Sequence, residues 1–417
     1  MTLKKVSRCY TATAVLLLNT LIIFVVLNIV VWGVGIFDES TTAIATPDPR
    51  DVYIPSAKLT VQSINFDALR QFYYYRTDVE IFRLLLEGMG LEFECDPDTI
   101  YRLKPRAGNY YNIVEAGYRV VSPQGSWPPD EQVYNIFVFG GSTTYGAGVA
   151  DNLTIPSWLQ DHLRAALGRD DLYVYNFGVP SFTSIQERWR FEALLRDGFE
   201  PDLAIFIDGV NDFINYNTLV SLSQESNCEP PLSFSSRFSN ILSCSYDELC
   251  FPVQRFATAL DARQSTSTTE EFMERAGYTA GPEAPPDDAA ANRRVIERWL
   301  QNKRAIDQRA SMEDISTIFV MQPTAAYAYD LSYHPLFDEN DMENTRFDFG
   351  YALWEAMYDE PLAGWAQNTL NLTRLGEDNQ GPIYLDGVHY TSDFSSEIAL
   401  AISDAIVERN LINASPQ

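Results

Sequence analysis

The stretch VYNIFVFGGSTT, residues 133–144, decides the fold, because a largely apolar run ends here in two glycines followed by Ser142. A short apolar run bounded by turn residues is typical of a strand buried on both faces. Two similar runs precede the sequences NFG, which contains Gly178, and GVND, which contains Asn211. The carboxyl ends of parallel strands meet at one edge of a sheet, so we expect Ser142, Gly178 and Asn211 to lie close together.

Predicted helices separate these strands, and such an alternation is typical of right-handed βαβ units around a parallel sheet. A last strand, Ile383-Tyr384-Leu385, is expected just before Asp386. The sequence therefore predicts an α/β fold, a flavodoxin-like three-layer αβα sandwich. The expected strands span residues 133–139, 172–175, 203–207, 315–321 and 383–385, and the expected helices span residues 155–167, 184–196, 292–309 and 393–408.

A fourth motif, Asp386-Gly387-Val388-His389, lies far downstream of Ser142. The chain has 3 histidines, and only His389 has an aspartate three residues before it. We expect His162 to be a structural residue of its helix, and His334 to be a substrate contact at most. A serine beside a histidine that a carboxylate orients is the arrangement of nucleophilic catalysis. His389 is therefore the predicted general base.

These four motifs, in this order and strand context, resemble those of the SGNH (GDSL-type) hydrolase superfamily. The resemblance covers residues 131–410. It implies that Ser142 is the nucleophile, that His389 is the base, and that Asp386 orients the imidazole. It also implies an oxyanion hole made of the Ser142 and Gly178 backbone N–H groups and the Asn211 side chain.

One residue departs from the family pattern. Gly141 stands where many members have an aspartate, but that aspartate has no proton-transfer role in the family. Each motif alone has an ordinary structural explanation: a strand-to-helix turn, a local Asn-Asp turn, or a helix cap at Asp386. Their conjunction in family order favours the catalytic interpretation.

The resemblance implies hydrolysis of carboxylic esters without a metal or an organic cofactor. The expected substrate is an acyl ester, with acylated glycans and lipids among the candidates. An alternative keeps the same residues but transfers the acetyl group onto polysaccharide or peptidoglycan. A non-catalytic scaffold is disfavoured, because a scaffold has no reason to retain Ser142, Asn211 and His389 together.

The charge balance bears on possible partners. Lys and Arg number 30 against 57 Asp and Glu, which gives a formal net charge of -27. Nucleic acid is thereby disfavoured as a partner, because phosphate binding needs a basic face. We interpret the acidity as a solvated surface rather than as a site for cationic substrates.

Residues 11–33 are apolar, and no charged residue occurs between Arg8 and Asp38. A stretch of about 22 residues spans roughly 33 Å as a helix, enough for a bilayer core. Basic residues precede this stretch and acidic residues follow it, so the positive-inside rule places the N-terminus in the cytoplasm and the rest outside. The rival is a cleaved signal peptide ending near Ala43-Ile44-Ala45, but the apolar stretch is long for one.

The expected organisation therefore has a membrane anchor and an extracytoplasmic catalytic domain. Its parts are a cytoplasmic tail (1–10), an anchor (11–33), a linker (34–60), an N-terminal module (61–130) that is helical around residues 79–86, and a hydrolase domain (131–410) with insertions at 213–290 and 324–380. The second insertion is rich in aromatic residues. Tyr329, Tyr333 and Trp354 either form an acyl- or glycan-binding wall or pack the insertion's own core.

Four of the five cysteines are expected outside the cytoplasm, in an oxidising compartment. Cys9 lies beside the anchor, and the four outside it are Cys95, Cys228, Cys244 and Cys250. An even number suggests two disulfides with three pairings, although free buried thiols are the alternative. No C-x-x-C pair or His/Cys cluster predicts a metal site.

Overall fold

The computed structural model describes residues 66–214, 285–336, 346–358 and 368–412. All of them belong to one of two compact units of the chain, the one made of residues 52–228 and 273–417. The predicted tail, anchor and linker lie outside the described residues, as does most of the predicted insertion at 213–290. No helix among the described residues is long and apolar enough to cross a membrane. The anchor therefore stays a prediction.

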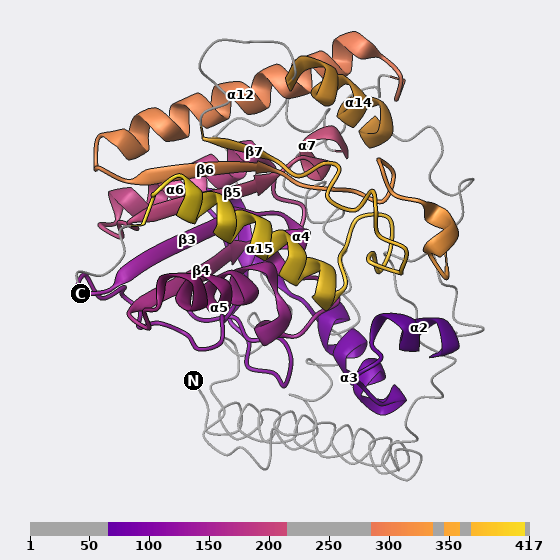
Figure 1. Cartoon of the computed structure of the whole chain (residues 1–417). Coiled ribbons are helices and arrows are strands. Elements are labelled where there is room, and N and C mark those ends of the chain that lie inside the picture. Colours follow the sequence, from indigo (N-terminus) through magenta and orange to yellow (C-terminus); the bar gives the residue numbers. More distant parts are fainter. Residues whose placement is uncertain (1–65, 215–284, 337–345, 359–367, 413–417) are drawn as a thin grey trace, which may run out of the picture. The chain divides into compact units, whose positions relative to one another are not determined.

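A parallel five-stranded sheet forms the centre of the described structure (Figure 1). Its strand order is β4-β3-β5-β6-β7, which corresponds to the order 2-1-3-4-5 of flavodoxin-type doubly wound sheets. The predicted α/β fold with a parallel sheet is confirmed. The strands are β3 (Tyr134–Gly140), β4 (Leu172–Gly178), β5 (Leu203–Asp208), β6 (Ser316–Met321) and β7 (Thr369–Asn371).

The two faces of the sheet differ in side-chain chemistry. Successive strand residues point to opposite faces, so Ile136 and Val138 of β3 lie on one face while Phe137 and Phe139 lie on the other. The other strands follow the same rule, which makes one face aliphatic and the other aromatic. Helices α5 (Ile155–Leu167) and α15 (Ser392–Glu408) cover the aliphatic face, and α6 (Ser184–Arg196), α12 (Ala289–Ser311) and α14 (Arg346–Tyr358) cover the aromatic face (Figure 1).

A row of stacked phenylalanines crosses the aromatic face. Phe139 lies 5.4 Å from Phe177 and 4.8 Å from Phe206, and Phe206 lies 5.3 Å from Phe319, measured between ring centroids. The four residues are register partners on β4, β3, β5 and β6. Each such pair contributes about 0.5–1.5 kcal/mol beyond the burial of its area. The row therefore helps to hold the four strands, and the turns that follow them, in register.

Local capping residues mark the ends of α5 and α6, the two helices whose predicted bounds match the structure to the residue. Thr154 caps α5 by accepting the Ser157 N–H, and Gly168 ends the helix with a φ of 62°. Helix α6 begins with a capping box between Thr183 and Gln186. These signals are local, so the sequence alone could show them.

The predicted last strand is wrong. Ile383 and Tyr384 are buried, but they lie in a loop in which Tyr384 makes one antiparallel bridge with Tyr390. The fifth strand is β7, which lies with α14 inside the predicted insertion at 324–380. An apolar run indicates burial but does not distinguish a strand from a buried loop.

The N-terminal module packs against the rest of this unit. It contains α2 (Phe66–Phe72), α3 (Asp78–Met89) and an antiparallel pair, β1 (Phe93–Asp96) and β2 (Ile100–Leu103). The helix predicted around residues 79–86 is α3. The remaining short helices are α4 (Ser142–Tyr145), α7 (Val210–Ile214) and two 3-10 turns at Asp151–Leu153 and Leu331–Tyr333.

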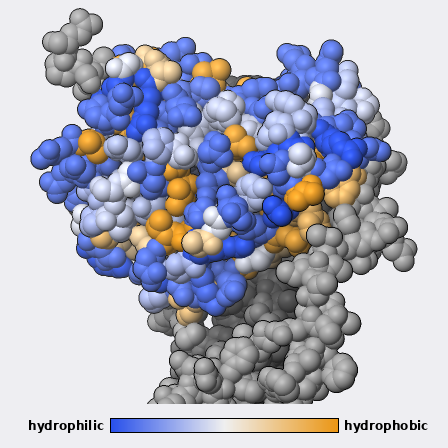
Figure 2. Space-filling model, turned by 90° about the horizontal axis from the view of Figure 1, so that it is seen from below, coloured by the Kyte–Doolittle hydropathy of each residue, from blue (hydrophilic) through white to orange (hydrophobic). Residues whose placement is uncertain are grey.

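The face shown in Figure 2 is mostly hydrophilic, with separate apolar patches. Such a surface agrees with interpreting the net charge of -27 as solvation.

Candidate active site

The structure brings three predicted residues into direct contact. The Nε2 atom of His389 lies 2.8 Å from the Oγ atom of Ser142, and its Nδ1 atom lies 2.7 Å from Oδ2 of Asp386. Ser142 and His389 are 247 positions apart in the chain. Both distances lie within hydrogen-bond reach of a nucleophile, a base and the group that orients it.

Ser142 owes its position to the end of β3. It is the first residue of α4, which begins directly after Gly140 and Gly141. A Cβ atom added at Gly141 would lie 2.2 Å from Nδ2 of Asn211. A side chain at residue 141 would therefore displace the Asn211 amide, which gives this chain a physical reason for glycine at that position.

The loop that carries His389 is closed by its own hydrogen bonds. Oδ1 of Asp386 accepts the N–H groups of Val388 and His389 at 2.9 and 2.8 Å, while Leu385 N–H donates to the His389 carbonyl at 2.7 Å. Asp386 thus caps this turn with one oxygen and contacts the imidazole with the other. The structural and the functional interpretations of D-x-x-H both apply.

Burial and pairing act in opposite directions on these two groups. The side chains of Asp386 and His389 are 6% and 15% exposed. Burial raises the pKa of Asp386, but the adjacent His389 and the two backbone N–H donors outweigh it, so the net pKa is lowered. Burial lowers the pKa of His389, but the charge and hydrogen bond of Asp386 outweigh it, so the net pKa is raised. The pair therefore favours a charged carboxylate beside an imidazole that readily takes up a proton.

The three predicted oxyanion donors differ in their present partners. Asn211 lies in α7 directly after β5, and one hydrogen of its Nδ2 donates to the Phe182 carbonyl at 2.8 Å. The amide group carries a second hydrogen that can serve another acceptor. Ser142 begins α4, so its N–H has no acceptor within that helix. The Gly178 N–H donates to Oδ1 of Asn176 at 3.0 Å and is already used inside the end of β4.

Three buried carboxyl groups were not predicted from the sequence, and they lie on α6, at the end of β5 and in α7 next to Asn211. Glu187, Asp208 and Asp212 are each at most 5% exposed. Asp212 accepts the Ser184 hydroxyl at 2.6 Å and the Ser184 N–H at 3.2 Å, while Asp208 accepts the Trp299 indole N–H at 3.0 Å. We call Glu187, Asp208 and Asp212 the acid cluster. Asp208 and Asp212 flank the predicted turn, but Glu187 lies on a different element, so sequence spacing could not assemble the group.

The acid cluster resists ionisation. Burial raises the pKa of Asp208 to about 6, and burial together with the charge of Asp208 raises the pKa of Asp212 to about 7. Burial and the neighbouring aspartates also raise the pKa of Glu187. Oε2 of Glu187 and Oδ1 of Asp208 are buried and have no hydrogen-bond partner among the described residues. The surroundings of the acid cluster therefore favour the protonated form of each of these carboxyl groups over the form it would take in water.

Two of the tentative substrate residues belong to the core. Trp354 is fully buried, packs 5.2 Å from Trp299 and donates to Oδ1 of Asn371. Tyr329 is 9% exposed, and its hydroxyl donates to the Gly381 carbonyl. Of the two alternatives that the sequence left open for these residues, a substrate-binding wall or packing in a core, their burial favours packing. Tyr333 is 37% exposed and remains available.

The other two histidines contact residues other than Ser142. His162 stacks on Trp158, and its Nε2 lies 3.0 Å from Oγ of Ser396. His334 is buried against Phe72, and its Nδ1 accepts the Leu336 N–H. Neither ring makes a hydrogen bond to a carboxylate within the part of the chain that the structure describes.

Three of the four cysteines predicted to form disulfides lie outside the described residues. Cys95 lies on β1, whereas Cys228, Cys244 and Cys250 lie outside the described residues. Their pairing stays a prediction. Among the described residues, no group of three or more His, Cys, Asp or Glu side chains is arranged to hold a metal ion.

Comparison with known proteins identifies one family. Residues 138–336 match the model of the GDSL-like Lipase/Acylhydrolase family. The matched stretch contains Ser142, Gly178 and Asn211 and ends before Asp386 and His389. Among curated proteins, none matches the chain.

Three of the solved structures that match this chain are a GDSL-like lipase from Bacteroides thetaiotaomicron, a lipase/acylhydrolase from Enterococcus faecalis and an acetyl xylan esterase from Geobacillus stearothermophilus. Their sequence identities are 14%, 14% and 11%, and their TM-scores are 0.33, 0.33 and 0.34. The matches cover 67%, 68% and 70% of this chain and 91%, 100% and 99% of the respective structures. Scores this low say nothing about the substrate.

Proposed function

Because residues 138–336 belong to the GDSL-like lipase/acylhydrolase family, this chain is an ester-hydrolysing enzyme, and we propose that it works through a covalent intermediate on Ser142. The observation that carries the proposal is the pair of hydrogen bonds of His389, 2.8 Å to Ser142 and 2.7 Å to Asp386. A histidine so placed can take the serine proton while a buried carboxylate stabilises the imidazolium that forms.

The proposed reaction has two halves. In the first, Nε2 of His389 takes the hydroxyl proton as Oγ of Ser142 attacks the ester carbonyl carbon, and it then gives that proton to the departing alcohol oxygen. In the second, His389 deprotonates a water molecule that attacks the acyl-Ser142 carbonyl. The carboxylic acid leaves, and the proton returns to Oγ of Ser142. The charge of Asp386 stabilises the imidazolium in both halves.

The negative oxygen of each tetrahedral intermediate needs hydrogen-bond donors. We assign the Ser142 N–H and the second Nδ2 hydrogen of Asn211, the latter supported by the Phe182 carbonyl that fixes the amide. One such donor contributes about 3 kcal/mol to the transition state. The Gly178 N–H can donate to this oxygen as well only if its hydrogen bond to Oδ1 of Asn176 breaks when substrate binds.

Labelling of the full-length protein with a fluorophosphonate tests the nucleophile. We expect the probe to label Ser142, and Ser142→Ala to abolish labelling and ester hydrolysis while the protein stays folded. The matched control is Ser396→Ala, because Ser396 also lies within 3.0 Å of a histidine, His162, but outside the proposed site. Labelling that persists in Ser142→Ala would place the nucleophile elsewhere.

Hydrolysis is favoured over acetyl transfer to a glycan. A transferase must seat a sugar hydroxyl at acyl-Ser142 and keep water away. Tyr329 and Trp354, two of the three aromatic side chains expected to seat a sugar, are buried in the core. Incubation with an acetyl ester plus an unacetylated oligosaccharide separates the two functions. We expect acetate to be released, and acetylated oligosaccharide as the main product would favour the transferase.

We further propose that the enzyme is anchored in a membrane with its catalytic domain outside the cytoplasm. The support is the sequence alone, namely the apolar residues 11–33 with basic residues before them and acidic residues after them. Protease added to spheroplasts should digest the chain from about residue 39 onward. Protection of the catalytic domain in intact spheroplasts would contradict this topology.

A further inference from the structure

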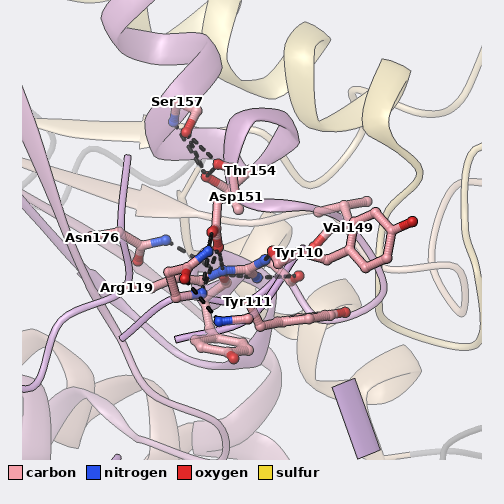
Figure 3. A network of polar contacts seen from close by, with 12 residues as sticks. Tyr110, Tyr111, Arg119, Val149, Asp151, Thr154, Ser157 and Asn176 are labelled. Atoms are coloured by element: carbon pink, nitrogen blue, oxygen red, sulfur yellow. Dashed lines mark hydrogen bonds and ion pairs between the residues drawn. The ribbon is translucent and has the colours of Figure 1, made fainter. Parts of the chain in front are cut away.

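Arg119 is a fully buried guanidinium outside the stretch that matches the family. Its Nε atom lies 2.8 Å from Oδ1 of Asp151, whose side chain is 12% exposed. An arginine has five N–H donors in a plane, and a buried one needs acceptors for them. Figure 3 shows where these donors point: the surrounding residues converge on Arg119 from several segments of the chain.

Most of the remaining acceptors are carbonyl groups of the segment that follows Ser142. Nη1 of Arg119 donates to the carbonyls of Tyr145 and Gly146 at 2.8 and 2.7 Å, and Nη2 donates to the Val149 carbonyl at 2.7 Å. We call residues 142–149, which comprise α4 and the loop after it, the nucleophile turn. The last carbonyls of a helix lack intrahelical donors and favour a positive charge, so Arg119 supplies what the end of α4 needs.

Two tyrosine rings hold the guanidinium in its plane. The Arg119 Cζ atom lies 4.2 Å from the ring centroid of Tyr111 and 4.7 Å from that of Tyr145, and the two rings are within 19° of parallel. Gly146 has a φ of 88°, and a Cβ atom there would lie 3.1 Å from Nη1 of Arg119. Lysine can neither stack in this way nor donate to several carbonyls in one plane.

The backbone of Arg119 ties the same segment to the sheet. Its N–H donates to the Asn176 carbonyl at 3.0 Å, and the Asn176 side chain donates to the Thr144 and Tyr145 carbonyls at 3.1 and 3.3 Å. The nucleophile turn is therefore held from β4 by Asn176 and from the N-terminal module by Arg119 (Figure 3).

Two more residues of the N-terminal module hold the same turn. The Tyr111 hydroxyl accepts the Gly148 N–H at 3.0 Å, and the Tyr73 hydroxyl donates to the Gly148 carbonyl at 2.8 Å. A Cβ atom at Gly148 would lie 2.4 Å from Cδ1 of Leu385, the residue before Asp386. The turn is thus confined between the N-terminal module and the loop that carries His389.

We propose that Arg119 is a positioning residue for the Ser142 nucleophile, so that the N-terminal module is part of the catalytic unit rather than a lead-in segment. This inference rests on the proposed function of Ser142. Arg119 fixes the end of α4, α4 fixes Ser142, and the 2.8 Å hydrogen bond to His389 depends on where Ser142 stands. A misplacement of about 1 Å lowers catalysis roughly 100-fold, so a loosened turn should reduce turnover without removing any reacting group.

The test is the rate at which a fluorophosphonate labels Ser142 in full-length Arg119→Lys, together with kcat and KM on a small ester. We expect the labelling rate and kcat to fall roughly 100-fold with KM nearly unchanged. The matched control is Arg164→Lys. Arg164 also donates twice to a carbonyl, that of Leu172, and lies over the ring of Tyr173, but at the amino end of β4. The Arg164→Lys variant should be labelled at the wild-type rate.

Wild-type labelling and kcat in folded Arg119→Lys would overturn the proposal, even if the variant melts at a lower temperature. If Arg119→Lys does not fold, Asp151→Asn replaces it, because the guanidinium stays while its charged partner is lost. A smaller loss of labelling rate is then expected, and an unchanged rate overturns the proposal. Failure of the proposed function looks different, because wild-type enzyme would then not be labelled at Ser142.

Discussion

Asp386 and the acid cluster are both buried, but their pKa values are shifted in opposite directions. Asp386 contacts His389 and two backbone N–H groups, so its pKa is lowered although the side chain is buried. No cationic side chain among the described residues contributes to the pKa values of the acid cluster, and burial raises those of Asp208 and Asp212. Burial therefore does not determine charge. The partners do, because a buried carboxylate stays ionised only where donors or a cation stabilise it.

The two sets also suit different tasks. A charged Asp386 can stabilise the imidazolium of His389 during the reaction. The acid cluster, whose pKa values are raised, is less suited to that task. However, Asp212 follows Asn211 directly and accepts both polar hydrogens of Ser184 at the start of α6. The cluster thus supports the segment that presents Asn211. The following changes test this contrast.

The largest effect is expected from His389→Ala. It removes the group that transfers every proton in the proposed reaction, so kcat should fall by roughly a million-fold. In the wild type, kcat/KM should rise with pH through the raised pKa of His389, because only the neutral imidazole can accept the serine proton. Steady-state kinetics on a small acetyl ester measures both. His162→Ala is the control, and near-normal turnover in His389→Ala would reject the proposed base.

Asp386→Asn should come next, with kcat lowered roughly 10,000-fold. The variant keeps the shape but loses the charge that raises the pKa of His389. The pH profile of the residual activity should therefore move to lower pH. A profile at the wild-type position would mean that the charge of Asp386 does not control His389, and the contrast between the two carboxyl sets would fail.

Asn211→Ala should lower kcat by about 100- to 1,000-fold through loss of one oxyanion donor. Gly141→Ala should lower kcat in the same direction, because the new Cβ atom displaces the Asn211 amide without deleting it. Gly168→Ala is a control for glycine replacement, since nothing lies within 4 Å of an added Cβ at that position. It should affect only stability, because φ is 62° there. Full kcat in Asn211→Ala would remove Asn211 from the site.

The smallest effect concerns stability and pH. In the unfolded chain Asp212 ionises near 3.8, whereas in the folded protein its pKa is about 7. Between these two pH values the folded state binds more protons than the unfolded state, so the free energy of unfolding falls as pH rises. The stabilising contribution of Asp212 is therefore fully present below pH 3.8 and is lost as pH rises through about 7. The amide of Asp212→Asn does not ionise, so the variant avoids this loss of unfolding free energy, which is on the order of 2–4 kcal/mol in the wild type.

Urea unfolding of wild type and Asp212→Asn at pH 5 and pH 8 measures the difference in stability between the two proteins, and paired measurement cancels the titration of all other carboxylates. We expect the variant to gain relative stability at pH 8. An equal difference at both pH values would mean that Asp212 ionises normally, and the acid cluster would then not differ from Asp386 in kind.

The sequence could show those parts of the site that follow strands. Gly178 ends β4, and Ser142 and Asn211 lie just beyond β3 and β5. The runs that form these strands are apolar enough to be recognised as buried strands, and parallel strands end at one edge of the sheet. Helices α5 and α6 were predicted to the residue because caps are local signals. The D-x-x-H motif was found by its residue types, although the strand predicted before it is a loop.

Other features depend on side chains that meet only in the folded chain. Glu187 on α6 joins Asp208 and Asp212 after β5, and Arg119 joins the nucleophile turn from the other side of β4. Neither has a fixed sequence spacing. Likewise, nothing in the aromatic composition of residues 324–380 could distinguish Trp354, fully buried, from Tyr333, 37% exposed.

The sequence by itself determined most of the elements and the reactive residue types, because hydrophobic period, caps and motifs are encoded over short stretches. Only the tertiary structure decided the charge on each buried carboxyl group and the partners of Arg119. A pKa depends on burial and on which groups lie within a few ångströms, and those neighbours come from segments far apart in the chain. Asp386 and Asp212 are the same residue type, and their surroundings alone give them opposite pKa shifts.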